Sequence, residues 1–131
     1  MNNLKYTKND IARILNRWVD FVTEMKVAHG KLTTSQGLSN FKSYEGLVEE
    51  FEYDLKYRAV LEEIIQNNLL TEVKKEAVLF LDNEFIKNTL KIDIKFWHLK
   101  NLPNIFADRI PYNVDDDFKK ALGTYHIIND S

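Results

Sequence analysis

Five carboxylates crowd into residues 43 to 54, a stretch that contains no basic side chain. These acidic residues are Glu45, Glu49, Glu50, Glu52 and Asp54. Tyr53 lies among them, and aromatic residues beside charges are typical of binding hot spots. Clustered carboxylates speed the encounter with a basic partner and pair with its Arg and Lys side chains. We therefore predict a partner-binding face here, with a solvated helix face that favours solubility as the alternative interpretation.

Asp115, Asp116 and Asp117 form a second acidic run near the end of the chain. They begin a short predicted helix, from residue 113 or 114 to Leu122, and acids are stabilised at the positive end of a helix dipole. An EF-hand would also need alternating ligands, a mid-loop glycine and a distant Glu, which do not follow here. We keep this run as a second candidate patch for a partner.

The residue types that metal and covalent chemistry need are scattered or missing. His29, His98 and His126 stand alone, at no spacing that pairs zinc ligands. Cysteine is absent, the four glycines are isolated, and there is no GxSxG elbow. The sequence therefore predicts no catalytic residues, no metal and no cofactor, and hence a protein that is not an enzyme.

One enzymatic alternative rests on Asp93-Ile94-Lys95, which resembles the acid-x-Lys pair of the PD-(D/E)xK nucleases. In such a site a carboxylate holds the metal and the lysine assists the attacking water. Asp82 or Glu84 would serve as the upstream acid. That fold needs a multi-stranded sheet, whereas this chain offers two candidate strands, and a charged residue on a strand is ordinarily on its solvent face.

Length and composition limit the number of domains and the classes of partner. A chain of 131 residues with 44% hydrophobic residues fits one domain, residues 1–131, with a packed core. The start of the chain lacks the basic and apolar regions of a secretory signal, and no window approaches the about 18 apolar residues of a membrane span. We expect a cytoplasmic protein that does not bind membranes. The formal net charge of −2 argues against general nucleic-acid binding.

The first two helices are predicted from caps and periodicity. Thr7 and Asp10 have capping-box spacing, apolar residues then recur every three or four positions, and Gly30 suits a helix end near His29. Residues 31–40 are predicted as a loop. A second helix starts near Asn40 or Ser43, and its apolar stripe shifts after residue 56. This shift favours a break or bend at residues 56–58, with a second half that packs against a different neighbour as the alternative.

A third helix follows Thr71, a plausible N-cap, and its apolar residues spread around most of its circumference. This distribution is typical of the central helix of a bundle. Residues 90–96 alternate apolar and charged side chains like a strand, with residues 125–128 as the candidate partner, and Pro103 and Pro111 indicate an irregular crossing between them. We predict a mainly α fold of three to four packed helices with an irregular C-terminal third that contains one or two short strands.

Two short motifs lie in the C-terminal half of the chain. The first is LFLDNEFIKNT, with Leu81, Asp82, Phe85 and Thr89, and the second is FWHLKNLP followed by DRIP, with Trp97, Arg109 and Pro111. Together these motifs resemble those of small immunity proteins encoded beside bacterial polymorphic and contact-dependent growth-inhibition toxins. The likeness spans residues 75 to 112. Such immunity families differ in fold, so the resemblance implies a role and no architecture.

The implied role is that of a cytoplasmic protein that binds a cognate basic toxin domain 1:1 and neutralises it without turnover. Many such toxins are nucleases with a basic cleft, which the acidic face would cover. Arg109 is expected to anchor the irregular segment through a carboxylate such as Asp82, because planar ion pairs suit Arg. A helical regulatory or adaptor protein remains the main alternative. The sequence leaves open whether the protein forms a homodimer.

Overall fold

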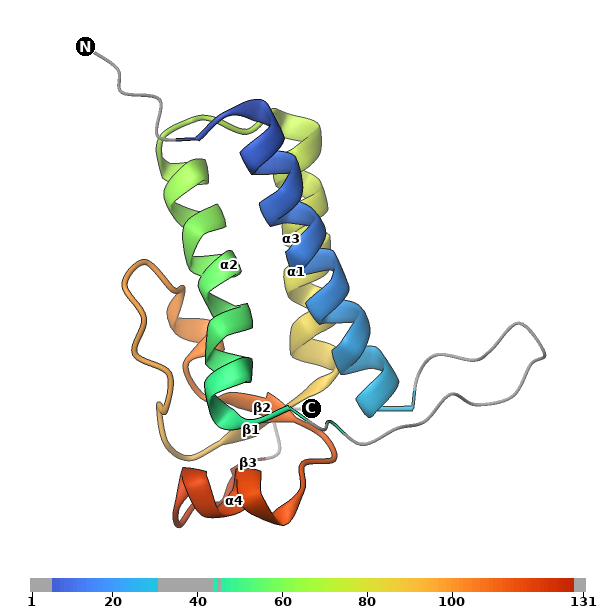
Figure 1. Ribbon diagram of the computed structural model, residues 1–131, viewed down its shortest axis with the longest axis vertical. Helices are drawn as coiled ribbons and strands as arrows, with labels where there is room; N and C mark the ends of the chain where they lie inside the picture. Colours follow the sequence, from blue (N-terminus) through green and yellow to red (C-terminus); the bar gives the residue numbers. More distant parts are fainter. Residues whose placement is uncertain (1–5, 31–43, 45, 129–131) are drawn as a thin grey trace, which may run out of the picture.

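The fold is mainly α, with a three-stranded sheet in its C-terminal part. The computed structural model describes residues 6–30, 44 and 46–128. Its long helices are α1 (Lys8–Ala28), α2 (Val48–Gln66) and α3 (Glu72–Lys87), which run along the long axis of the molecule. The sheet and the short helix α4 (Asp116–Leu122) lie at the end where α1 and α3 finish and α2 begins (Figure 1).

The bounds of α1 confirm the sequence prediction. Thr7 accepts a hydrogen bond from the backbone N–H of Asp10, and the Asp10 carboxylate accepts one from the backbone N–H of Thr7, both at 3.0 Å. His29 is the C-cap, and Gly30 follows with φ of 75°, a conformation that glycine adopts without steric cost. Reciprocal capping satisfies two backbone donors that have no partner inside the helix.

The central helix is α1, so the prediction that α3 occupies the middle is wrong. Helix α1 packs against both α2 and α3, and it contributes more buried apolar side chains than either of them. On α3, Val73 is 76% exposed, and Leu79 and Phe80 are each 61% exposed. The apolar residues of α3 surround its axis as predicted, but no described element covers its outer side.

Helix α2 is continuous, which corrects the predicted break at residues 56–58. Phe51, Leu55 and Arg58 are successive inward positions at helical spacing, and all three are buried. The apolar stripe is interrupted because its third position holds an arginine. The predicted start was also too early: residues 40–43 lie outside the described part, and Tyr44 forms a parallel bridge with Val114 before the helix begins.

The sheet has the order β2-β1-β3 and is antiparallel. Strand β1 (Thr89–Ile92) is shorter than the predicted strand, and β3 (Ile127–Ile128) pairs with it inside the predicted segment 125–128. Strand β2 (Arg109–Pro111) was not predicted, because Pro111 suggested irregular structure. Since β2 is an edge strand, a proline that lacks an N–H is tolerated there.

The remaining C-terminal elements are short. A 3₁₀ turn, η1 (Asn104–Phe106), precedes β2, and α4 ends at Gly123, which has φ of 80°. The buried aromatic rings of Trp18, Phe51, Phe85, Phe106 and Phe118 join the helices to this part of the chain. Within the described ranges, no helix has the length and apolar character needed to cross a membrane.

Candidate functional site

Two groups of charged side chains stand out among the described residues, and the first lies inside the bundle. Arg58 on α2 donates from Nε to Asp82 Oδ1 at 2.9 Å and from Nη2 to Asp82 Oδ2 at 2.8 Å. Trp18 on α1 donates from Nε1 to Asp82 Oδ1 at 3.1 Å, and Arg58 Nη1 also reaches Glu62 Oε1 at 3.0 Å. One carboxylate therefore links all three long helices.

Burial and pairing oppose each other in this network. Burial raises the pKa of the Asp82 carboxyl, and hydrogen bonds from Arg58 and Trp18 oppose that rise. Burial lowers the pKa of Arg58, but its hydrogen bonds and attraction to Asp82 and Glu62 outweigh that effect and raise it. Both oxygens of Asp82 are occupied, and the side chains of Arg58 and Asp82 are 6% and 8% exposed. Asp82 therefore holds the fold together and does not face a ligand.

Three other residues of the two sequence motifs, Thr89, Trp97 and Arg109, donate hydrogen bonds to backbone carbonyls. Thr89 Oγ1 donates to the carbonyl of Phe85 at 2.8 Å, and Trp97 Nε1 donates to the carbonyl of Arg109 at 2.8 Å. Arg109 does not pair with Asp82 as expected, because Arg58 already occupies that carboxylate. Arg109 instead donates from Nη1 to the carbonyls of Ile86 and Thr89, at 3.2 and 3.3 Å.

The residues of the nuclease alternative are held apart by separate partners. Asp93 accepts hydrogen bonds from the backbone N–H of His126 at 2.7 Å and contacts His126 Nδ1 at 3.0 Å. Glu84 pairs with Lys26 at 2.7 Å, and Asp82 belongs to the internal network. In the part of the chain that the structure describes, no three His, Cys, Asp or Glu side chains are grouped to hold a metal ion.

The second charged group is on the surface, where the structure collects part of the predicted acidic face. Glu49, Glu50, Tyr53 and Asp54 line a shallow hollow of about 360 Å³ in the first turns of α2. Glu45 lies outside the described residues. Glu52 does not line this hollow, although it lies within about 60° of Glu49 around the helix axis. We call the four lining residues the acidic hollow.

Helix α1 adds two acids that sequence reasoning missed. Burial raises the pKa of Glu24, and the negative charges of Asp54, Asp20 and Glu50 raise it further. Burial likewise raises the pKa of Asp54, with Arg17 opposing and Glu50 adding to the rise. These mutual effects show that carboxylates of α1 and α2 share one electrostatic environment beside the acidic hollow. The signal in the sequence was their spacing, because Asp20 and Glu24 are four apart, as Glu50 and Asp54 are.

Tyr44 lies under this cluster. It is 6% exposed and packs edge-on against Phe51 and Phe118. Burial raises the pKa of its hydroxyl, and the charges of Asp54, Glu24 and Glu50 add to the rise. The packed rings of Tyr44, Phe51 and Phe118 therefore lie beneath the carboxylates of α1 and α2.

The second predicted patch starts α4. Asp115 is the N-cap, and its Oδ1 accepts from the backbone N–H of Phe118 at 2.9 Å. Asp116 and Asp117 are exposed in the first turn. The helix end accounts for all three acids, and their role toward a partner stays a prediction.

A scan of protein-family models, a search of curated proteins and a search of solved structures each found no match.

Proposed function

We propose that this protein is a cytoplasmic immunity protein that binds a cognate basic toxin domain 1:1 and neutralises it by covering its surface. The observation that carries the proposal is the group of carboxylates that lines the acidic hollow on α2, with Glu24 of α1 near enough for the charges of Asp54 and Glu50 to raise its pKa. Within the described residues, Glu24, Glu49, Glu50 and Asp54 form no ion pair. The resemblance of residues 75 to 112 supplies the class of partner.

The electrostatics support a basic partner. Glu24 and Asp54 have raised pKa values because burial and neighbouring carboxylates disfavour their ionised forms. An arginine or lysine placed at the hollow would reverse this effect, since an opposite charge within a few ångströms favours the ionised carboxylate. Binding of a cation therefore relieves repulsion that the free protein carries.

The position of the hollow also supports binding. It lies on α2, which the Arg58–Asp82–Trp18 network ties to α1 and α3, so its carboxylates are presented by a rigid scaffold. Sites on preorganised elements lose less conformational entropy on binding than sites on loops. Tyr53, which is 56% exposed, adds an aromatic contact at the edge of the hollow.

The test is calorimetric titration with the C-terminal domain of the polypeptide encoded directly upstream, at low and at high salt. We expect nanomolar 1:1 binding that weakens as salt rises, because exposed charge pairs are screened. Toxin activity is measured in the same mixtures and should fall in proportion to complex formed. Absence of binding would remove the proposal, whereas binding that leaves toxin activity intact would favour the adaptor alternative.

A further inference from the structure

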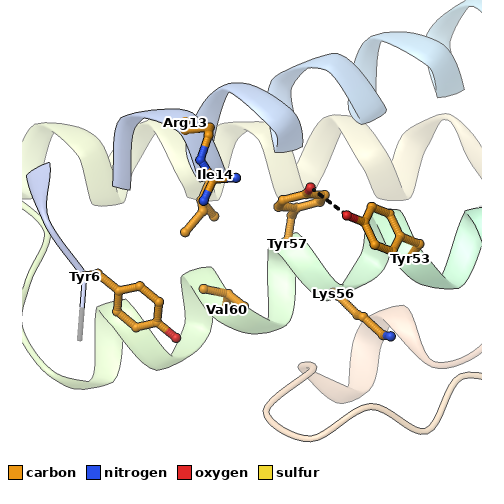
Figure 2. A pocket seen from close by; sticks show the side chains of 7 residues that line it. All are labelled: Tyr6, Arg13, Ile14, Tyr53, Lys56, Tyr57 and Val60. Carbon is orange, nitrogen blue, oxygen red and sulfur yellow. Dashed lines mark hydrogen bonds between the residues drawn. The ribbon is translucent and has the colours of Figure 1, made fainter. Parts of the chain in front are cut away.

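A second hollow lies between α1 and α2, and Tyr53 borders it as well as the acidic hollow. Figure 2 shows its side chains: Ile14 reaches in from α1, Val60 and Tyr57 line it from α2, and Tyr6 closes the end away from Tyr53. It has a volume of about 250 Å³, and Arg13 and Lys56 complete its lining, one from each helix. We call it the aromatic notch.

The charge of the notch is opposite to that of the acidic hollow. Arg13 and Lys56 are exposed and form no ion pair with any described residue. A third cation is nearby, because the guanidinium of Arg17 lies 5.6 Å from the ring centroid of Tyr57. The carboxylate of Glu63 is at the far end, where it accepts from the Tyr6 hydroxyl at 3.3 Å.

Tyr53 and Tyr57 separate the two hollows. Their rings pack edge to face with centroids 5.7 Å apart, and the Tyr57 hydroxyl donates to the Tyr53 hydroxyl at 3.4 Å (Figure 2). Tyr53 lines both hollows. Because α1 and α2 run in opposite directions, the second half of α1, which carries Asp20 and Glu24, lies beside the first half of α2, which carries the acidic hollow (Figure 1).

We propose that the aromatic notch is the anchor site for one aromatic side chain of the protein partner, with a carboxylate beside it that pairs with Arg13 and Lys56. This inference rests on the proposed function for its partner. The apolar floor and tyrosine walls suit an aromatic ring, which prefers edge-to-face or offset contacts with other rings. Two exposed cations at the rim suit an acid and disfavour a base.

Size favours a single side chain over a free small molecule. Small-molecule sites usually enclose about 300 to 1,000 Å³ and bury most of the ligand, whereas this notch is smaller and open along one side. Continuity with the acidic hollow adds to this argument. A partner that lies along α1 and α2 would place a basic residue on the hollow, an aromatic residue in the notch and an acidic residue beyond it.

The experiment uses acetylated, amidated dipeptides as probes and the amide spectrum of the full chain as the readout. The Trp-Asp dipeptide is expected to shift the amide signals of Ile14, Tyr57 and Val60 with millimolar affinity. The Trp-Lys dipeptide should bind about five-fold more weakly, as loss of an exposed ion pair predicts. Arg13→Gln with Lys56→Gln should remove that preference.

The matched control is Lys119→Gln with Lys120→Gln, which removes the same charge from exposed positions on α4. It should keep the preference for Trp-Asp. No shifts at about 10 mM dipeptide, equal affinity for both dipeptides, or an unchanged preference in the Arg13/Lys56 variant would each overturn the inference. Binding of free indole-3-acetate about ten-fold tighter than Trp-Asp would instead assign the notch to a small aromatic acid.

This experiment tests the anchor site separately from the proposed immunity role, because the dipeptide probes contain no toxin. Toxin binding without dipeptide binding would remove the anchor site alone. Dipeptide binding without toxin binding would leave the notch and remove the immunity role.

Discussion

Helix α2 carries charge in two settings that behave oppositely. Arg58 is buried, and its guanidinium makes three hydrogen bonds to Asp82 and Glu62. One turn or more earlier, Glu49, Glu50 and Asp54 face solvent beside acids of α1. The comparison shows that the buried charge of Arg58 is matched by partners within the fold, while Glu49, Glu50 and Asp54 form no ion pair with a described residue.

The energetic consequences differ for the same reason. Removing one member of a buried ion pair leaves the other charge desolvated, which is costly. Exposed acids interact through water and contribute little to the free energy of unfolding. Variants of the two groups should therefore separate stability from binding.

The largest effect is expected for Asp82→Ala. The buried guanidinium of Arg58 and the indole N–H of Trp18 would lose their acceptor, so the free energy of unfolding should fall by about 3–5 kcal/mol. Urea denaturation measures this loss. Asp54→Ala, on the same bundle but in the acidic hollow, is the control and should change stability by less than about 1 kcal/mol.

A double variant sharpens this result. Arg58→Met with Asp82→Leu removes both charges and should be more stable than Asp82→Ala by at least about 1 kcal/mol, since buried pairs are often replaceable by apolar residues. If Asp82→Ala cost less than about 1 kcal/mol, the network would not hold the helices together.

The next effect concerns binding. Glu50→Lys with Asp54→Lys should weaken toxin binding by more than about 1 kcal/mol and leave unfolding within about 0.5 kcal/mol, because these charges are at the surface. Titration calorimetry and thermal unfolding measure the two quantities. Glu72→Lys with Glu76→Lys makes the same charge change on exposed positions of α3 and should leave affinity nearly unchanged.

Two outcomes would contradict that prediction. Unchanged affinity in the α2 variant would return its acids to the solvated-face interpretation. A larger loss in Asp116→Lys with Asp117→Lys would place the interface at α4.

The smallest expected effect is a change in how the free energy of unfolding depends on pH. The pKa of Asp54 is raised above its ordinary value of 3.8, so its ionised form destabilises the folded state at neutral pH. As pH falls toward the raised pKa, the folded protein takes up this proton before the unfolded chain does, and stability rises on that account. Asp54→Asn should therefore be more stable than the natural protein at pH 7, with an advantage that shrinks toward pH 5.

Urea denaturation of both proteins at the two pH values measures the difference. Three carboxyls, those of Asp10, Glu84 and Asp93, have lowered pKa values. Their ionised forms stabilise the folded state, and this effect changes at lower pH than the effect of Asp54. Their contribution is present above their ordinary pKa values and is lost only as pH falls through the lowered ones. A variant advantage that grows toward pH 5 would contradict the prediction.

Local signals in the sequence account for the elements that were predicted well. Thr7, Asp10 and Gly30 mark the ends of α1, Thr71 marks the start of α3 and accepts from the backbone N–H of Lys74, and alternation marks β1. The break predicted in α2 was wrong because its apolar stripe shifts along a continuous helix. Arg58, at the shift, is buried with its charge neutralised by a residue 24 positions away.

The residues of the candidate site likewise divide into those that the sequence predicted and those that only the structure showed. Glu49, Glu50, Tyr53 and Asp54 were predicted from their density on one helix, and the structure brings them together. Glu52 was predicted with them but does not line the hollow, because density along a chain does not specify which side chains border one depression. The contribution of Asp20 and Glu24, and the notch beside Tyr57, depend on how α1 packs against α2.

The sequence by itself determined where α1 begins and ends and where α3 begins, that the fold is mainly α, and that one stretch of α2 is strongly acidic, since caps, periodicity and composition act between near neighbours in the chain. Only the tertiary structure decided that α1 and not α3 is central, that Asp82 pairs with Arg58 and not Arg109, and that acids of two helices meet. Those outcomes depend on contacts between residues far apart in the chain, whose free energies compete across the whole core and leave no local pattern.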